Sequence, residues 1–247
     1  MAHFTYLGGM CVLVEREDGF KILCDPYFAP GCGYTPEQFY DVDLILVSHA
    51  AFDHYGSLNE LMENGHATLI AAGDTRRILC KAVQDIDQTR LLRTVHGDRR
   101  IFGETVVRPV YAMHVSASNP EGVHVNGVPY GFVVQVEKNV CYYHTGDTYL
   151  FSDMKLLREL YHPNVMVVGI SAIGEGFPCE MTPREAAIAA AFVGAQVIIP
   201  SHYVPGSAAL EEFMQCMAII CPDTVVKSGI GRTFQYRPYS CEDVRKI

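Results

Sequence analysis

Apolar runs of strand length alternate with predicted helices along the chain, and this alternation constrains the fold more than any other feature. Runs that are almost wholly apolar are typical of strands buried on both faces, as in sheets covered by helices. The clearest are Leu44–Val47, Val165–Ile170 and Val197–Pro200. A helix between the last two is marked by the capping box Thr182-Pro183-Arg184-Glu185, with proline at its first position, and is predicted to cover Pro183–Val193.

Shorter strand patterns occupy the start, middle and end of the chain. Turn residues such as Gly8-Gly9, Asp18-Gly19 and Lys138-Asn139 separate them. Because strands and helices alternate in both halves without a low-complexity linker, we expect one domain over residues 1–247, with halves 1–110 and 111–247. The expected fold is α/β, an αββα sandwich of two mixed β-sheets with helices on the outer faces. The shorter predicted strands are Phe4–Leu7, Met10–Glu15, Lys21–Cys24, Ala67–Ala72, Leu91–His96, Glu104–Val115, Tyr130–Glu137, Val140–His144, Thr224–Lys227 and Thr233–Arg237.

Charge and cysteine content narrow the classes of function. The net charge is −9, whereas proteins that bind nucleic-acid backbones usually present a basic surface. A local basic pocket for a small anion is still compatible with this charge. No apolar run reaches membrane-spanning length, Met1–Tyr6 lacks a signal-peptide pattern, and the nine cysteines form no Cys-x-x-Cys pair. We therefore expect a cytoplasmic protein with neither nucleic-acid nor membrane partners.

Two histidines and an aspartate follow one of the buried strands directly. The segment Ser48–His54 contains His49, Asp53 and His54 immediately after the run Leu44–Val47. Ligand groups of α/β proteins gather at such strand ends. Imidazole and carboxylate together suit Zn, Mn, Fe or Ni. The alternative for this segment alone is an Asp–His hydrogen bond within a loop.

Three further strand ends repeat the pattern. His114 follows the run Val106–Met113, Asp147 follows Val140–His144, and His202 follows Val197–Pro200. A single histidine in such a place is more often structural than metal-binding. Four separate segments that end alike favour a metal site built from His49, Asp53, His54, His114, Asp147 and His202.

These motifs resemble a known family over nearly the whole chain. The order His-x-His-x-Asp-His, His, Asp, His resembles the metallo-β-lactamase superfamily. Thr5–Gly9 through Ile22–Pro26 is similar to its opening strands. Three stretches look most like the branch of cytosolic metal-dependent hydrolases related to L-ascorbate-6-phosphate lactonase, namely Tyr143–Thr148 with Phe151–Met154, Met181–Ala187 and Ile199–Tyr203.

The resemblance implies up to two divalent metal ions per chain, Zn or Mn. One would be held by His49, the residue at position 51, His114 and Asp147, and the other by Asp53, His54, His202 and the bridging Asp147. A metal-activated water would attack a small ester, lactone or phosphodiester substrate, expected to be anionic or ester-like. Asp53 would also orient that water as a catalytic residue. Relatives of this fold are often oligomers, which implies a homo-oligomer.

The chain departs from the family pattern at position 51. The family has histidine there and this chain has Ala51, whose methyl group cannot bind a metal. We expect the second metal site to persist and the first to be weak or empty, so that one metal is bound. Two explanations stay open: an enzyme disabled by alteration, or a natural protein that works with one metal or has another purpose.

Two other functions compete with the hydrolase. A non-catalytic ligand-binding or sensing protein on the same fold would explain Ala51. A tRNA-processing nuclease of the superfamily is disfavoured by the acidic charge.

Three further residues are candidates for lesser roles. His144 either orients a metal ligand or is a buried structural histidine. Tyr203 could stabilise a developing oxyanion, although core packing is the slightly favoured alternative. His124, in a Gly/Asn/Pro-rich stretch, could reach the substrate, but a solvent-exposed loop histidine is the preferred interpretation.

Overall fold

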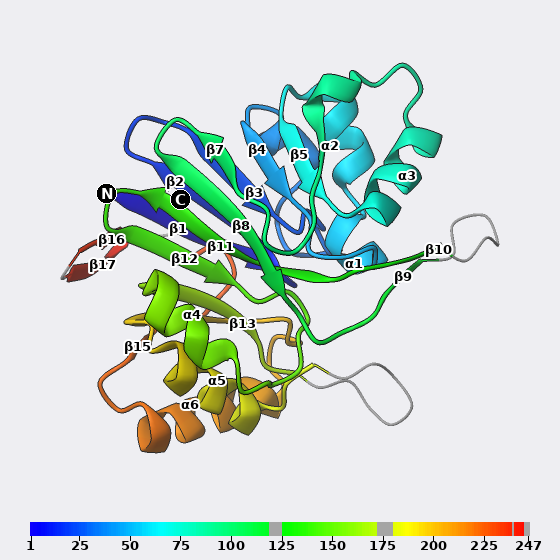
Figure 1. The fold of residues 1–247 in the computed structure, drawn as a ribbon. Coiled ribbons are helices and arrows are strands. Elements are labelled where there is room, and N and C mark those ends of the chain that lie inside the picture. Colours follow the sequence, from blue (N-terminus) through cyan, green and yellow to red (C-terminus); the bar gives the residue numbers. More distant parts are fainter. Residues whose placement is uncertain (119–124, 172–179, 239, 245–247) are drawn as a thin grey trace.

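The computed structural model describes residues 1–118, 125–171, 180–238 and 240–244. Two β-sheets face each other at its centre, and two groups of helices cover their outer sides (Figure 1). This arrangement confirms the predicted αββα sandwich.

The first sheet combines an antiparallel and a parallel part, with the strand order β17-β16-β1-β2-β3-β4-β5-β6. Its parallel part begins where β3 pairs with β4. The strands are β1 (Ala2–Gly8), β2 (Cys11–Arg16), β3 (Lys21–Cys24), β4 (Leu44–Leu46), β5 (Thr68–Ala71), β6 (Leu91–Arg93), β16 (Thr233–Arg237) and β17 (Ser240–Val244).

The second sheet is mixed as well, with the order β15-β14-β13-β12-β11-β8-β7. Its strands are β7 (Arg100–Phe102), β8 (Thr105–Tyr111), β11 (Tyr130–Glu137), β12 (Val140–His144), β13 (Val165–Gly169), β14 (Val197–Ser201) and β15 (Val225–Val226). A separate two-stranded ribbon, β9 (Ser116–Ser118) and β10 (Val125–Gly127), projects from the body (Figure 1).

The helices divide between the two sheets. The first sheet is covered by α2 (Leu58–Asn64) and α3 (Gly73–Ala82), which follow the short helix α1 (Phe52–Tyr55). The second sheet is covered by α4 (Met154–Tyr161), α5 (Pro183–Val193) and α6 (Ala208–Ile220). Two 3-10 turns, Pro36–Phe39 and Gln88–Arg90, complete the described helical segments.

Burial on both faces explains the continuous apolar runs. Successive strand residues point to opposite sides of a sheet. In β12, Tyr142 therefore enters the core between the sheets, where its ring centroid lies 5.6 Å from that of Phe4, while Tyr143 packs towards the helices. A third apolar cluster, which includes Ile45 and Leu61, lies between the first sheet and its helices.

Local sequence signals located two elements closely. The hairpin β11–β12 has the predicted bounds, with Asn139 of its turn at a φ of 63°. Helix α5 covers Pro183–Val193 as predicted, and Thr182 and Glu185 form the expected reciprocal capping box.

Several short elements were not predicted. Helices α1 and α2 contain 4 and 7 residues, too few for a clear helical period. Strand β17 follows the two strands expected to end the chain. The strand expected over Glu104–Val115 is β8, which ends earlier, at Tyr111, and β9 and β10 lie beyond it.

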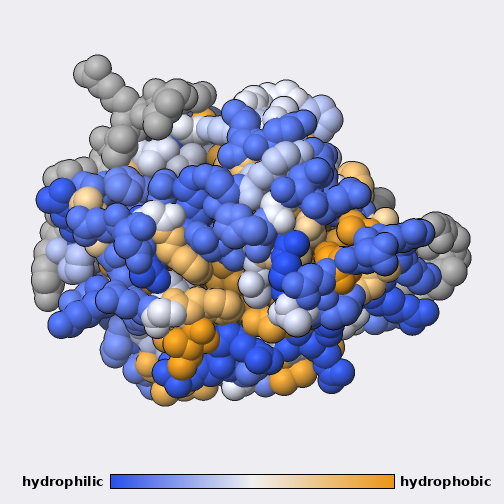
Figure 2. Space-filling view, turned by 90° about the horizontal axis from the view of Figure 1, so that it is seen from above, coloured by the Kyte–Doolittle hydropathy of each residue, from blue (hydrophilic) through white to orange (hydrophobic). Residues whose placement is uncertain are grey.

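The face in Figure 2 is mainly hydrophilic, with hydrophobic side chains in smaller patches. Among the described residues, no helix combines the length and apolar character needed to cross a bilayer.

Candidate metal centre

Strand ends bring the predicted side chains together. His49 follows β4, His114 follows β8, Asp147 follows β12 and His202 follows β14, while α1 carries Asp53 and His54. Parallel strands place their carboxyl ends at the same edge of a sheet, and the two facing sheets direct these edges towards one point.

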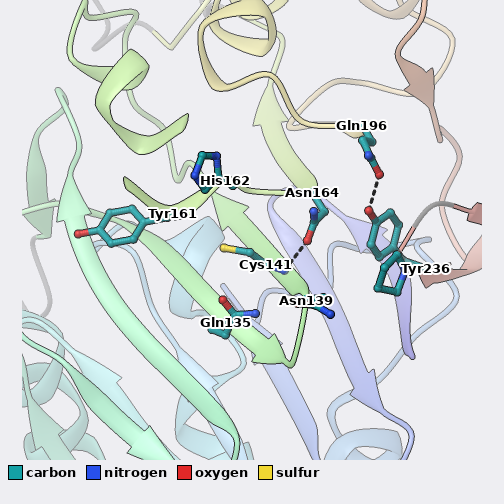
Figure 3. Close-up of a pocket in the computed structure, with 9 residues that line it drawn as sticks. Gln135, Asn139, Cys141, Tyr161, His162, Asn164, Gln196 and Tyr236 are labelled. Atoms are coloured by element: carbon teal, nitrogen blue, oxygen red, sulfur yellow. Dashed lines mark hydrogen bonds between the residues drawn. The ribbon is translucent and has the colours of Figure 1, made fainter. Parts of the chain in front are cut away.

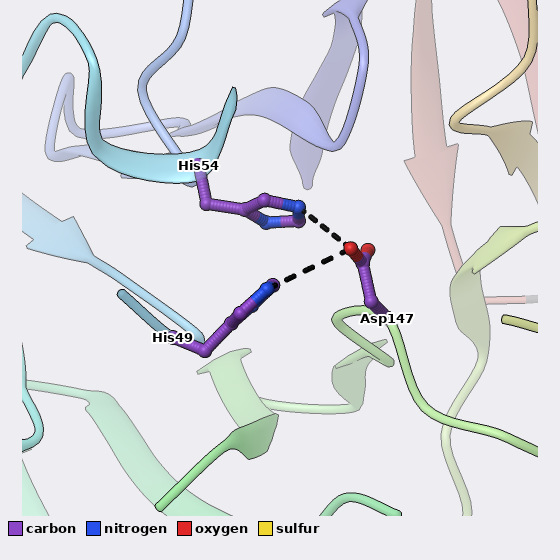
Figure 4. Close-up of side chains that lie close together, drawn as sticks. All are labelled: His49, His54 and Asp147. Carbon is purple, nitrogen blue, oxygen red and sulfur yellow. Dashed lines mark ion pairs between the residues drawn. The ribbon is translucent and has the colours of Figure 1, made fainter. Parts of the chain in front are cut away.

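The carboxylate of Asp147 is the centre of this cluster. Its Oδ2 atom lies 2.9 Å from Nε2 of His54 and 3.7 Å from Nε2 of His49 (Figure 4). The Nε2 atoms of His202 and His114 are 3.8 and 4.0 Å from the same oxygen. Four imidazoles thus converge on one carboxylate whose side chain is only 6% exposed.

The backbone before Asp147 can pass here only without a side chain. Gly146 has a φ of 57°, and a Cβ atom at this position would lie 2.9 Å from the backbone oxygen of Tyr130. Glycine therefore allows β12 to turn sharply and direct Asp147 between the sheets.

Asp53 is the accessible carboxylate of the cluster. Its Oδ2 atom lies 3.2 Å from Nε2 of His202, and its side chain is 46% exposed, compared with 6% for Asp147. Burial alone would raise the pKa of Asp53, but the hydrogen bond from His202 and the nearby imidazole of His54 lower it. Asp53 is therefore the carboxylate that a substrate can approach.

Asp25, which directly follows β3, lies behind the cluster. Its Oδ2 atom accepts hydrogen bonds from His54 Nδ1 at 3.0 Å, His144 Nε2 at 2.8 Å and Ser48 Oγ at 2.8 Å. Its Oδ1 atom accepts the Ser48 backbone N–H at 2.7 Å. Burial alone would raise the pKa of Asp25, but the imidazoles of His54 and His144 hold it well below its usual range.

These contacts fix how two imidazoles face the cluster. Nδ1 of His54 bonds to Asp25, and Nδ1 of His49 lies 3.0 Å from Ser48 Oγ. Both Nε2 atoms therefore point to Asp147. Burial and the neighbouring His54 lower the pKa of His49 to about 3, so this imidazole is neutral near pH 7. Burial alone would also lower the pKa of His54, but Asp147 and Asp25 raise it to about 10.

Glu180 is a second buried carboxylate that the sequence analysis missed. Its Oε1 atom lies 2.8 Å from Nδ1 of His202, which turns Nε2 of that ring towards Asp53 and Asp147. Burial and the charge of Asp147 raise the pKa of Glu180 to about 7. A Cβ atom at Gly169 would lie 2.9 Å from Glu180 Oε2, so glycine at the end of β13 permits this close approach.

A sequence signal existed for Asp25 and not for Glu180. Asp25 follows the apolar strand Lys21–Cys24, the same position that identified His49 and Asp147. Glu180 precedes the Thr182 capping box, and no strand run leads into it. Only the tertiary structure brings it to His202.

Left-handed backbone occurs at two residues of this region other than glycine. Asp25 has a φ of 45° and His202 a φ of 51°. Such conformations cost about 1–3 kcal/mol each for residues other than glycine and are typical of functional sites. The His202 backbone N–H donates to the Gly9 carbonyl at 2.8 Å, which holds this turn in place.

Ala51 is the N-cap residue of α1, and its carbonyl accepts the backbone N–H of His54 at 2.9 Å. The preceding Ala50 N–H donates to Ser116 Oγ at 3.0 Å, and Ser116 bonds in turn to Asp74. The loop that carries His49 is thus anchored from β9 and α3.

The three lesser candidates have different surroundings. His144 contacts Asp25 and the Tyr142 hydroxyl at 2.7 Å, so it supports the partner of His54. Tyr203 stacks on Tyr6, with ring centroids 6.3 Å apart, and lines a cavity beside His202. His124 lies outside the described residues.

One cavity lies beside the cluster, and another lies at the far end of the second sheet's parallel strands. The one beside the cluster, of about 360 Å³, includes Asp53 and His202 in its wall. The other, of about 310 Å³, lies by the amino ends of the second sheet's parallel strands (Figure 3). There Asn164 accepts the Cys141 backbone N–H at 2.8 Å and Gln196 pairs with Tyr236, so these groups stabilise the fold.

Comparisons with known proteins identify the family of this chain. The beta-lactamase superfamily domain matches residues 21–203. A UPF0173 metal-dependent hydrolase of Methanoregula boonei is 37% identical over 204 residues, which cover 81% of this chain and 82% of the relative. One of Pyrococcus horikoshii is 33% identical over 93% of this chain and 98% of its own length.

A solved structure is similar in fold. Igni18, a metallo hydrolase from Ignicoccus hospitalis, superposes with a TM-score of 0.76 at 23% identity and covers 96% of this chain and 99% of its own. The chain therefore belongs to the metallo-β-lactamase superfamily and, within it, to the UPF0173 family of metal-dependent hydrolases.

Proposed function

We propose that this protein is a metal-dependent hydrolase that uses water to cleave a small ester, lactone or phosphodiester. The observation that carries the proposal is the convergence of four imidazoles on the buried carboxylate of Asp147, with the accessible Asp53 beside them. Structural ion pairs seldom need four histidines around one carboxylate, whereas metal centres do.

The donor atoms fit a divalent cation. The buried Nε2 atom of His49 and Oδ1 of Asp147 have no hydrogen-bond partner among the described residues. Unpaired polar atoms in a protein interior are costly unless something binds them. Imidazole with carboxylate suits Zn or Mn. The proposed ligands are His49, His114 and Asp147 for one ion, and His54, His202, Asp53 and Asp147 for another.

A bound divalent cation supplies Lewis acidity, which favours deprotonation of water near neutral pH and polarises a carbonyl or phosphoryl oxygen. Asp53, accessible from the cavity, can orient the attacking water and carry its proton to the leaving group. Asp25 and Glu180 hold His54 and His202 in orientation through their Nδ1 atoms.

Ala51 favours a second candidate function, a non-catalytic ligand-binding or sensing protein. The family pattern has histidine at this position, and a methyl group leaves the first ion with His49, His114 and the shared Asp147. We expect one tightly bound ion in this chain and a second in Ala51→His.

Elemental analysis and hydrolysis assays on the chain, Ala51→His and Asp147→Asn test both functions. We expect Ala51→His to bind a second ion and hydrolyse faster, and Asp147→Asn to lose metal. Asp87→Asn is the matched control, because Asp87 caps an exposed 3-10 turn. Metal bound by the chain and by Ala51→His, without turnover of any ester, lactone or phosphodiester, would support the binding protein instead.

A further inference from the structure

The cavity beside the cluster, here called the recess, opens next to the proposed reaction centre. Its volume is about 360 Å³, and Asp53 and His202 form the wall nearest the cluster. The rest of its wall comes from the β1–β2 turn, the loop after β3, the segments after β13 and β14, and the segment before β16. These parts contribute Tyr27, Ala29, Pro30, Tyr203, Val204 and Ile230, together with small residues.

Away from the proposed metal centre, the wall of the recess offers no counter-charge to an anion. None of the described residues that line it is a lysine or an arginine, its one histidine is the proposed metal ligand His202, and its one carboxylate is Asp53. An anionic group placed there would lose hydration without gaining a partner, which is costly. An apolar group would be stabilised by about 25 cal/mol for each Å² of its surface removed from water.

The net charge of the whole chain also disfavours the binding of anions. A net charge of −9 creates a potential that lowers the local concentration of anions and leaves neutral molecules unaffected. Both observations favour a neutral substrate over the anionic one expected from the sequence.

We propose that the recess binds an uncharged, apolar substituent of the substrate, so that the protein hydrolyses a neutral alkyl-substituted lactone or carboxylic ester. This inference rests on the proposed hydrolase function and names its substrate class. Water adds its oxygen to the carbonyl carbon, the bond from that carbon to the ester oxygen breaks, and the released oxygen takes a proton. The products are a carboxylic acid and an alcohol, joined in one molecule when a lactone opens.

The direct test is a series of γ-lactones with alkyl side chains of increasing length, each paired with a lactone whose side chain ends in a carboxylate. We expect kcat/KM to rise about fourfold for each added methylene until the recess is filled, from about 0.8 kcal/mol per buried CH₂. The carboxylate-ended partners should react at least about tenfold more slowly than their alkyl counterparts.

Two variants locate the effect in the recess. Ile230→Ala enlarges it and should move the best chain length upwards. Val204→Lys places a cation at its rim, where Val204 is 69% exposed, and should reduce the discrimination against carboxylates. The matched control is Ile219→Ala on α6, where Ile219 is 82% exposed and outside the recess, and it should change neither property.

Calorimetric binding of alkyl-substituted cyclopentanones, which mimic the lactones but are not hydrolysed, separates this inference from the hydrolase proposal. Affinity that rises with chain length and responds to Ile230→Ala, without turnover of any ester, lactone or phosphodiester, supports the proposed role of the recess and refutes the hydrolase proposal. Turnover that is independent of chain length, or faster for carboxylate-ended lactones, refutes the proposed role of the recess and is consistent with the hydrolase proposal.

Discussion

Asp25→Asn is the substitution that tests the organisation of this centre most directly. Asp25 is fully buried and does not line the recess, so it acts only through its neighbours. Its two oxygens accept four hydrogen bonds, from His54, His144 and the side chain and backbone of Ser48. The substitution keeps the shape of the side chain and removes its charge and one acceptor.

The expected magnitude follows from these contacts. Asparagine can keep its carbonyl oxygen towards the donors around Oδ2, but its NH₂ group then faces the Ser48 backbone N–H, which Oδ1 now accepts at 2.7 Å. One unsatisfied buried donor costs about 1–3 kcal/mol of folding free energy. Loss of the negative charge behind His54 weakens its Nε2 as a ligand, and removing such a partner typically lowers metal affinity about 10- to 100-fold.

Competition with a chromogenic chelator measures the affinity, while circular dichroism and thermal unfolding follow the fold. Asp43→Asn is a suitable control, because Asp43 also accepts a backbone N–H, from Lys21 at 2.8 Å, but lies at the opposite end of β4 from His49. A folded Asp25→Asn with unchanged metal affinity would refute the argument that Asp25 orients His54.

Three further changes have defined outcomes. Gly146→Ala should lower the melting temperature and reduce metal binding, because its Cβ would lie 2.9 Å from a β11 carbonyl oxygen at a positive φ. Thr182→Ala should lower the free energy of unfolding by about 1 kcal/mol in urea titrations, whereas Ser207→Ala, whose side chain makes no cap bond, should not. Burial raises the pKa of Tyr142 and Tyr143. The native chain therefore keeps both protons above pH ~10 while the unfolded chain releases them, and stability should fall as pH rises, by about 1.4 kcal/mol per pH unit for each tyrosine. Near-UV absorbance that showed these tyrosines ionising before unfolding would contradict this.

The sequence by itself determined the layers of the fold and most of the cluster. Strands such as Val165–Gly169 are apolar throughout because one face packs between the sheets and the other against helices. That pattern depends only on residue type and order. The same runs end at His49, Asp147 and His202, so the sequence also indicated which polar side chains meet.

Only the tertiary structure decided how these side chains are held and what lies beside them. Glu180 reaches His202 because Gly169 leaves room at the end of β13, a contact between segments with no local signal. Asp25 contacts His144 from the opposite sheet. The recess joins turns from distant parts of the chain. Hydrophobic periodicity indicates which face of a segment is buried, but not which residues of other segments contact that face. The orientation of the imidazoles and the choice of substrate at this centre depend on such contacts.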